Sequence, residues 1–378
     1  MAESPRLMPG ATLGVLGGGQ LGRLFVIDAL RMGYKAWVLD PDVQSPAGAV
    51  ASRHLASDYT DAKALEEMGR GCDAITIEFE NIPAESVKTL STMTRVTPSV
   101  YCIEIAQDRR AEKSFMAEHG LRVAPFAVIE SEADISAAVE SVGFPSILKT
   151  ARLGYDGKGQ FVCRNESDIV DGFTAVSGVP CVLERRIDLA MELSVVLARS
   201  DAGDLAAFPV AENLHVNGIL DTSCVPASCT EALAAKAIEM AGAIADALHY
   251  VGVLAVELFV DQQGELLVNE IAPRPHNSGH YTLDATSTSQ FEQQVRMLCN
   301  LPAGSTRLQT SVVMLNLLGD RWIPDDPDWN VLYQNTESKL HLYGKAAARA
   351  GRKMGHINVL GKDMATIQAE IGRLQRSL

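Results

Sequence analysis

The stretch Thr12–Leu24, "TLGVLGGGQLGRL", predicts a strand, a glycine turn and the first turn of a helix. Its glycines at positions 17, 19 and 22 have the spacing G-x-G-x-x-G after an apolar run. In dinucleotide-binding folds, backbone amides in such a turn approach a pyrophosphate, and an acid about 20 residues further on binds a ribose. Asp40 ends the next apolar run, "KAWVLD", where such an acid is expected. The stretch therefore leaves two interpretations open, a nicotinamide site or a turn that faces another phosphate compound.

The residues that follow continue the alternation of strands and helices as far as about Pro98. The pattern predicts helices over residues 19–33 and 61–71 and strands over residues 35–40 and 72–79. Strands that alternate with helices form parallel sheets with crossover helices. The first hundred residues therefore predict an α/β unit of the mononucleotide-binding kind.

Composition and charge exclude several classes of protein. The 378 residues are 47% hydrophobic and 21% charged, an ordinary globular profile, and the formal net charge is −14. A protein that grips a nucleic-acid backbone needs a basic face, so we expect no nucleic-acid partner. The seven cysteines are dispersed, contain no C-x-x-C pair and indicate reduced thiols. With no apolar run of membrane-spanning length and no targeting pattern at the first residues, we expect no membrane segment and a cytoplasmic protein.

The rest of the chain changes character after about Gln107. A helix from Gln107 is followed by short strands and one helix between residues 126 and 193, and then by segments that alternate at period two. Residues 231–248 predict a long amphipathic helix, and residues 251–274 predict two strands around the turn "DQQG". These patterns are typical of an α+β region with antiparallel strands.

The hairpin at residues 251–274 carries a pair of carboxylates. If "DQQG" forms the loop, Val260 lies opposite Glu265 and Glu257 lies opposite Val268. Glu257 and Glu270 are then diagonal neighbours on one face, roughly 7 Å apart. Two carboxylates among apolar residues repel unless one is protonated or a cation lies between them, and magnesium prefers such oxygen ligands. The alternative is a solvent-facing acidic pair on an edge strand.

Three further segments suggest a site for a nucleoside triphosphate and an anionic substrate. Lys149 ends an apolar strand before "GYDGKGQ", residues 154–160, whose glycines let amides approach phosphate oxygens. Lysines for phosphate and carboxylates for magnesium are the two halves of a nucleoside triphosphate site. The polar loop "APRPHNSGHYT" follows Glu270, and residues 345–353 hold a basic cluster suited to an anion. The alternatives are a mobile hairpin tip for the glycine segment and a solvated helix end for the cluster.

Taken together, these motifs resemble those of the ATP-grasp enzymes and, within them, the 5-(carboxyamino)imidazole ribonucleotide synthetase family of purine biosynthesis. The resemblance rests on "GGGQLGRL", "EFENIP", "QDRRAEKSF", "GYDGKGQ", "NEIAPRPHNSGHYT", "TSQFEQ" and "GRKMGHIN", which occur in the family's order over nearly the whole chain. It implies a Rossmann-like substrate-binding domain (1–106), an ATP-grasp lid (107–192) and a large ATP-grasp domain with a mixed or antiparallel sheet (193–378). It also implies that the first domain binds the ribonucleotide substrate and no NAD.

The resemblance implies an activity and a homodimer. Family enzymes use ATP, Mg²⁺ and bicarbonate to form carboxyphosphate, which carboxylates the amine of 5-aminoimidazole ribonucleotide. An ordered loop over the phosphates would protect carboxyphosphate from water.

By the same resemblance, each candidate site residue has an expected role. ATP would contact Arg109, Lys149, Gly154, Tyr155, Asp156, Gly157, Lys158, Gly159, Gln160, Glu184, Arg185, Arg186, Ile187, Glu192, His215, Asn269 and Glu270. The metal ligands would be Glu257 and Glu270. Catalytic roles would fall to Arg274, Tyr155, Asp156 and Lys158, with the Arg274 guanidinium on the carboxyphosphate charge. The aminoimidazole ribonucleotide would contact Gln20, Leu21, Glu80, His276, Asn277, Ser278, Lys345, Arg352 and Lys353.

Two rival functions remain open at this point, and the chain departs from the family in three places. One rival is another ATP-grasp ligase, such as the formate-dependent glycinamide ribonucleotide transformylase, and the other is a regulatory nucleotide-binding protein without turnover. Leu153 stands where the family often has glycine, Leu342 stands where tryptophan is common, and the usual proline before Gly351 is missing. None of these departures removes an expected charge contact.

Overall fold

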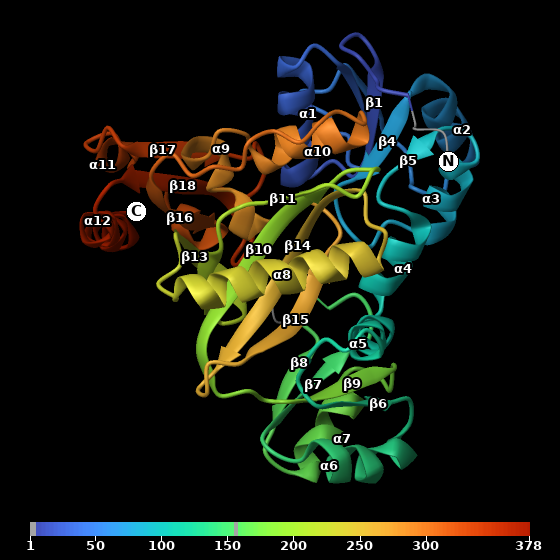
Figure 1. The fold of residues 1–378 in the computed structure, drawn as a ribbon, viewed down its shortest axis with the longest axis vertical. Helices are drawn as coiled ribbons and strands as arrows, with labels where there is room; N and C mark the ends of the chain where they lie inside the picture. The colour runs from blue at the N-terminus through green and yellow to red at the C-terminus, as the bar shows by residue number, and fades with distance from the viewer. Residues whose placement is uncertain (1–4, 155–157) are drawn as a thin grey trace.

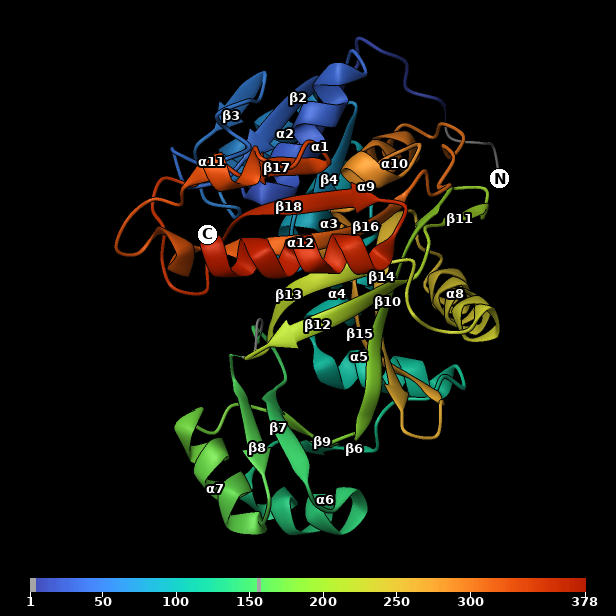
Figure 2. The same ribbon diagram turned by 90° about the vertical axis from the view of Figure 1, so that its left-hand side faces the viewer.

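The computed structural model describes residues 5–154 and 158–378. Within them the chain forms three sheets, and Figures 1 and 2 show these as three stacked regions of one elongated molecule. The first sheet is parallel, with strand order β3-β2-β1-β4-β5, which confirms the predicted α/β unit. Its strands are β1 (Thr12–Leu16), β2 (Lys35–Leu39), β3 (Arg53–Leu55), β4 (Ala74–Ile77) and β5 (Arg95–Val96). Its helices are α1 (Gln20–Arg31), α2 (Ala62–Gly71), α3 (Ala84–Ser91) and α4 (Val100–Gln107).

A short helix, α5 (Arg109–Glu118), connects the first region to the second. Asp108 caps it, because the Asp108 carboxylate accepts a hydrogen bond from the amide of Arg110. The second region is a small antiparallel sheet of order β6-β9-β7-β8. It consists of β6 (Phe126–Ile129), η1 (Glu132–Asp134), α6 (Ile135–Val142), β7 (Ser146–Thr150), β8 (Gln160–Cys163), α7 (Glu166–Ala175) and β9 (Cys181–Arg185).

The third region is a large antiparallel sheet of nine strands. Eight of them have the order β15-β14-β10-β12-β13-β16-β18-β17, and β11 pairs with β10. The strands are β10 (Leu189–Arg199), β11 (Leu205–Ala207), β12 (Ala211–Val216), β13 (Ile219–Val225), β14 (Gly252–Asp261), β15 (Leu266–Ala272), β16 (Ser311–Leu318), β17 (Ser338–Leu342) and β18 (Lys353–Gly361). The helical segments are α8 (Glu231–Ala247), η2 (Asn277–Gly279), α9 (Thr282–Ala285), α10 (Gln290–Leu298), η3 (Gly319–Trp322), α11 (Trp329–Leu332) and α12 (Met364–Ser377).

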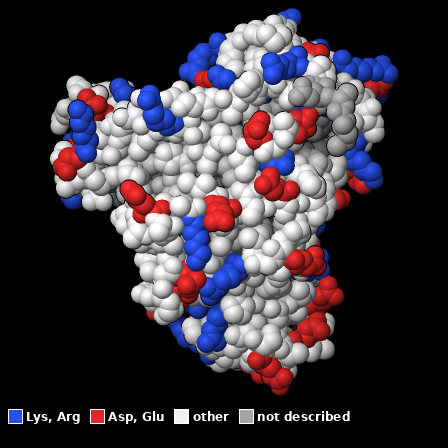
Figure 3. All heavy atoms as spheres, in the orientation of Figure 1, with Lys and Arg blue, Asp and Glu red and all other residues white. Residues whose placement is uncertain are grey.

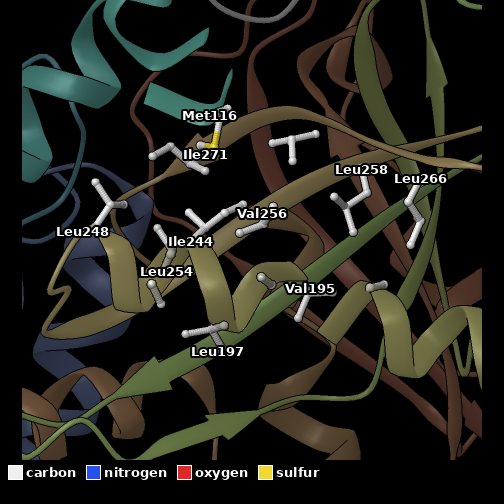
Figure 4. Packing of buried hydrophobic residues seen from close by; sticks show 14 of the residues in the cluster. Met116, Val195, Leu197, Ile244, Leu248, Leu254, Val256, Leu258, Leu266 and Ile271 are labelled. Carbon is white, nitrogen blue, oxygen red and sulfur yellow. The ribbon is translucent and has the colours of Figure 1, made fainter. Parts of the chain in front are cut away.

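The core beside the hairpin is formed by α8 and α5 packed against one face of the large sheet. Figure 4 shows Ile244 of α8 beside Leu254 and Val256 of β14, and Met116 of α5 beside Ile271. All of these side chains are buried. This packing fixes α5 next to β15, the strand that carries Glu270.

Charged side chains of both signs lie on the surface of the molecule. Figure 3 shows acidic and basic side chains beside each other on one face. In the described part of the chain, no helix combines the length and the hydropathy needed to cross a bilayer.

Candidate active site

One large cavity lies where the three regions meet, with a volume of about 1550 Å³. Its walls come from the first sheet and its loops, from the small sheet, and from the hairpin and the C-terminal strands of the large sheet. Most of the candidate site residues line it. They are Gln20, Leu21, Glu80, Arg109, Lys149, Gly154, Lys158, Gln160, Glu184, Arg185, Arg186, Ile187, Glu192, His215, Glu257, Asn269, Glu270, Arg274, His276, Asn277, Lys345, Arg352 and Lys353.

Five candidate residues are not among the lining residues. Tyr155, Asp156 and Gly157 lie outside the described residues. Gly159 has φ +71°, and its α-carbon faces Thr150, so it acts in the turn of the glycine segment. Ser278 is buried behind His276, where its hydroxyl lies 2.9 Å from His276 Nδ1 and accepts a hydrogen bond of 2.7 Å from Ser194 Oγ. Ser278 therefore holds the His276 ring in place by a hydrogen bond, without lining the cavity itself.

The hairpin places Glu257 and Glu270 directly opposite each other, which corrects the predicted diagonal register. The loop has three residues instead of four, so Val260 pairs with Leu266 and not with Glu265. Leu258 pairs with Val268, and a β-bulge at Asn269 then brings Glu257 opposite Glu270. Opposite residues in an antiparallel pair have Cβ atoms about 4.5–5.5 Å apart, closer than the diagonal distance. The prediction that the two carboxylates share one face is confirmed.

Different side chains contact the two carboxylates. Arg109 Nη1 lies 2.8 Å from Glu270 Oε2, and His276 Nε2 lies 3.2 Å from Glu257 Oε1. Burial, with the nearby charge of Glu270, raises the pKa of Glu257 to about 7. Burial acts on Glu270 too, but the Arg109 guanidinium outweighs it and lowers the pKa of Glu270 to about 2. Arg109 therefore favours the ionised form of Glu270, whereas burial and the charge of Glu270 favour the protonated form of Glu257.

Asn269, the bulge residue, adds a third oxygen on the same side. Its amide nitrogen lies 3.3 Å from Glu257 Oε2, to which it donates a hydrogen bond. Its Oδ1 is buried and, among the described residues, accepts no hydrogen bond. Two carboxylates and an unengaged amide oxygen form a set of hard oxygen donors.

Two buried lysines meet a third carboxylate on the opposite wall. Lys149 Nζ of β7 lies 3.0 Å from Glu184 Oε2 of β9, and Lys113 Nζ of α5 lies 3.3 Å from the same atom. Burial raises the pKa of Glu184, but the two lysines outweigh it and lower the pKa to about 2. The resulting excess of positive charge, together with Arg109, suits the phosphates of a nucleotide.

The glycine turn before α1 is filled by the chain's own carboxylates. Glu78, at the end of β4, accepts hydrogen bonds from the amides of Gly19 and Leu21. Asp40 accepts one of 2.7 Å from the amide of Gly18 and another from the Tyr59 hydroxyl. These are the amides that would face a pyrophosphate in a dinucleotide site. The nicotinamide interpretation is therefore wrong on structural grounds, and Asp40 supports the turn instead of a ribose.

The remaining charged candidate residues line other parts of the cavity. Arg274 Nε donates to Glu80 Oε2 at 2.5 Å, and both residues line the cavity. His215 Nδ1 lies 2.5 Å from Glu192 Oε2. Lys345 Nζ donates to the carbonyl of Lys353, and Arg352 donates to the carbonyl of Ala347. These backbone contacts hold the basic cluster together at one end of the cavity.

The sequence analysis missed several residues at the site. The lining includes Glu78, Asn81, Gln107, Glu112 and Phe259, none of which was a candidate. Phe259 could have been found from strand alternation, since it shares a face with Glu257. Lys113 could not, because its role depends on the packing of α5 between two sheets.

Leu153 is the one family departure whose backbone is unusual. Its φ is +63°, which a leucine rarely adopts, and its side chain is exposed at the cavity mouth. A glycine fits this conformation without strain, which explains in physical terms why glycine is common there.

Three family models match successive segments of the chain. The ribonucleotide synthetase preATP-grasp domain matches residues 10–107, the ATP-grasp domain matches residues 114–291, and the phosphoribosylaminoimidazole carboxylase C-terminal domain matches residues 312–370.

Sequence relatives carry the same name. The N5-carboxyaminoimidazole ribonucleotide synthase of Bacillus subtilis (strain 168) is 43% identical over 356 residues, which cover 94% of this chain and 92% of the relative. The enzyme of the same name from Brucella melitensis biotype 1 is 43% identical over 357 residues, 94% of this chain and 98% of the relative.

Solved structures agree over the whole chain. An N5-carboxyaminoimidazole ribonucleotide synthetase in complex with ADP superimposes with a TM-score of 0.93 at 42% identity, covering 99% of this chain and 98% of that one. The Aspergillus clavatus N5-carboxyaminoimidazole synthase in complex with ADP and 5-aminoimidazole ribonucleotide has a TM-score of 0.90 at 28% identity, covering 98% and 99%. With this fold, this cavity and these relatives, the chain belongs to the N5-carboxyaminoimidazole ribonucleotide synthase family of ATP-grasp ligases.

Proposed function

We propose that the chain catalyses the ATP- and bicarbonate-dependent carboxylation of 5-aminoimidazole ribonucleotide, in purine biosynthesis. The observation that carries the proposal is the single cavity lined by the carboxylate pair, the buried lysine of β7 and the C-terminal basic cluster. A triphosphate, a metal and an anionic ribonucleotide can meet there. The names of the relatives support the same reaction.

The proposed metal is Mg²⁺, held by Glu257 and Glu270. The donor set supports it, because both carboxylates and the unengaged Asn269 Oδ1 are hard oxygens on one side of the hairpin. No group of three or more His, Cys, Asp and Glu side chains suited to a metal occurs in residues 5–154 and 158–378, which fits an ion that takes its other ligands from phosphate and water. Bound there, Mg²⁺ would neutralise charge on the transferring phosphoryl group.

The proposed ATP contacts come from the two walls of the cavity. Arg109 and Lys149 provide the charges for the phosphates, and Gly154, Lys158, Gly159 and Gln160 are proposed to contribute from the glycine segment. Tyr155, Asp156 and Gly157, which lie outside the described residues, are proposed as further ATP contacts. Residues 184–187 line the place proposed for adenine. Glu192, held by His215, is the proposed ribose contact.

Two displacements make up the proposed reaction. A bicarbonate oxygen attacks the γ-phosphorus, the bond to ADP breaks and carboxyphosphate forms. The exocyclic amine of the ribonucleotide then attacks the carboxyl carbon, phosphate leaves with the bonding electrons and the nitrogen loses a proton. Arg274, oriented by Glu80, is proposed to stabilise the carboxyphosphate charge. Tyr155, Asp156 and Lys158 are proposed to order the reacting groups.

The proposed ribonucleotide site lies between the glycine turn and the basic cluster. Gln20, Leu21 and Glu80 contribute from the first region, and His276 and Asn277 contribute from the loop after β15. Lys345, Arg352 and Lys353 are proposed to bind the 5′-phosphate. Ser278 keeps an indirect role through His276.

The domain division, the oligomeric state and the cellular location belong to the same proposal. The domain division 1–106, 107–192 and 193–378 stays a proposal. The strands of the first two sheets fall within the first two domains, at residues 12–96 and 126–185, whereas β10 (Leu189–Arg199) of the third sheet crosses the proposed boundary after residue 192. A homodimer and a cytoplasmic location are proposed from the family resemblance. The proposed partners are small molecules alone.

The test is ADP release by the purified protein with Mg²⁺. We expect release that requires bicarbonate and rises strongly when 5-aminoimidazole ribonucleotide is added. Release that requires formate and glycinamide ribonucleotide would instead establish the rival transformylase activity. ATP binding without stimulation by either ribonucleotide would show that the substrate assignment is wrong.

A further inference from the structure

The bulge at Asn269 is a structural requirement for the carboxylate pair. Near the turn, Val260, Phe259 and Leu258 pair in one regular register with Leu266, Leu267 and Val268. Had that register continued, Glu257 would pair with Asn269, and Glu270 would pair with Val256. Neighbouring residues of a strand point to opposite faces, so Glu270 would then lie on the face away from Glu257. The extra residue reverses this and brings the two carboxylates together.

Helix α5 holds the backbone on both sides of Glu270. Lys113 Nζ donates a hydrogen bond of 2.8 Å to the carbonyl oxygen of Asn269. Glu112 Oε1 accepts one of 2.6 Å from the amide of Ile271. These two consecutive side chains are 1% and 3% exposed, and a bulge leaves backbone groups outside the regular ladder that need such partners. Figures 1 and 2 show α5 between β15 and the small sheet.

Lys113 also reaches the small sheet. Its Nζ lies 3.3 Å from Glu184 Oε2 of β9, the atom that contacts Lys149 Nζ at 3.0 Å. The Lys113 ammonium group therefore links β15, at its bulge, to the carboxylate of Glu184. Glu184 in turn orients Lys149, the lysine proposed to bind phosphate. A lysine that only balanced the charge of Glu184 would need no contact with Asn269.

We propose that Lys113 and Glu112 are positioning residues that clamp the Asn269 bulge, so that Glu257 and Glu270 stay on one face at a fixed distance from Lys149. This inference rests on the proposed function, because it assigns the pair to a metal. The clamp acts on the geometry of the metal ligands and not on the nucleotide. Its loss therefore weakens binding of the metal more than binding of ADP.

Lys113→Met keeps the length and apolar stem of the side chain and removes the donor. We expect Mn²⁺ binding to the ADP-loaded protein to weaken by about 10- to 100-fold, as for other residues that orient metal ligands. ADP binding without metal should weaken clearly less than Mn²⁺ binding, because Lys149 and Arg109 remain for the phosphates although one positive charge is lost. Lys236→Met is the matched control, since Lys236 is an exposed lysine that contacts Glu265 at the far end of the same hairpin. Unchanged Mn²⁺ affinity in Lys113→Met, or equal losses for Mn²⁺ and ADP, would overturn the clamp.

A second pair of variants covers the case in which Lys113→Met does not fold. Glu112→Gln keeps an oxygen acceptor for the amide of Ile271 and should bind Mn²⁺ nearly as the wild type does. Glu112→Leu removes the acceptor and should weaken Mn²⁺ binding, with faster amide exchange in residues 269–271. Equal behaviour of the two variants would contradict the proposal.

Hydrogen exchange of the unmodified protein provides a test that needs no variant. If α5 clamps the bulge, peptides covering residues 266–272 and 109–118 lose their protection at the same denaturant concentration. Early, separate exchange of residues 269–271 would refute the clamp. Neither hydrogen exchange nor Mn²⁺ binding depends on turnover. A protein that does not carboxylate the ribonucleotide would therefore contradict the proposed function without contradicting the clamp.

Discussion

Two pairs of carboxylates line the same cavity, and their surroundings give them opposite roles. Asp40 and Glu78 end strands of the first sheet, and their oxygens accept hydrogen bonds from the amides of the glycine turn. Glu257 and Glu270 face each other beside one arginine and one histidine, next to an amide oxygen without a partner among the described residues. The oxygens of Asp40 and Glu78 accept hydrogen bonds from backbone amides and so stabilise the glycine turn. The oxygens of Glu257 and Glu270 are the ones proposed to bind a cation. The chemistry of an acidic pair therefore depends on the donors around it.

The largest expected effect is the loss of ATP turnover in Glu270→Gln. Under the proposed function, removal of this ionised carboxylate takes away a ligand for Mg²⁺, and such a cation contributes several kcal/mol to phosphoryl transfer, about 10³-fold in rate. ADP release should fall by that factor, while circular dichroism shows a folded protein. Glu265→Gln, on the exposed turn of the same hairpin, is the control. If Glu270→Gln releases ADP at a normal rate, the second pair is as structural as the first.

The next effect is a pH-dependent stability difference in Glu112→Gln. Burial and the charge of Glu270 raise the pKa of Glu112 to about 7, above its ordinary value of 4.5. Between pH 4.5 and 7 the folded protein keeps this proton while the unfolded chain loses it, so this carboxyl makes folding less favourable as the pH rises. The difference in unfolding free energy between Glu112→Gln and the wild type should therefore shift in favour of the variant by up to about 3 kcal/mol as the pH rises from 4.5 to 7. Above pH 7 this difference should stay constant.

Urea unfolding at several pH values measures this difference. Glu118→Gln, an exposed residue of the same helix, serves as the control. A free-energy difference that does not change with pH would show that Glu112 ionises as it does in water.

A smaller effect on stability, without a metal defect, is expected for Glu78→Ala. The amides of Gly19 and Leu21 lose their acceptor, which costs about 1–3 kcal/mol for buried groups. Mn²⁺ binding to the ADP-loaded protein should stay within about twofold of the wild type. Glu85→Ala, on the exposed face of α3, is the matched control. If Glu78→Ala keeps the full unfolding free energy but no longer binds Mn²⁺, then Glu78 is a metal ligand and the roles assigned to the two carboxylate pairs are wrong.

The smallest effect is expected for Tyr59→Phe. It removes one hydroxyl donor from Asp40 and should lower the unfolding free energy by about 1 kcal/mol. ADP release should not change, because the remaining contacts hold the turn. A change in ADP release without a change in stability would mean that Tyr59 acts through the substrate side of the cavity.

Local patterns predicted much of the fold. The strand, glycine turn and helix of residues 12–31, the long helix α8 and the hairpin all have periodicities or turn residues that act within a few positions. The order of the strands in the large sheet was not predicted, because β10 pairs with β14 across more than fifty residues of chain and no local signal encodes that pairing.

The sequence predicted most of the residues that line the cavity, but it did not predict how the hairpin pairs them. The hairpin loop was taken as one residue too long, and the Asn269 bulge was missed, yet these two errors cancel and leave Glu257 and Glu270 on one face. A bulge depends on what packs against the strand, here two side chains of α5, and not on the strand's own pattern. The role of Glu78 was not predicted either, because it depends on tertiary contacts with amides that lie 57 and 59 residues away in sequence.

The carboxylate of Glu78 also has a consequence for inhibitor selectivity. Compounds built to imitate dinucleotide cofactors direct a pyrophosphate, or a neutral substitute for it, at the first amides of the helix after the glycine turn. In this protein those amides already donate to Glu78, and an incoming anion would meet a buried acid in their place. Screening collections rich in nicotinamide mimics would therefore yield few ligands for this turn, whereas neutral or cationic fragments that pair with Glu78 would distinguish this protein from the dehydrogenases that share its glycine spacing.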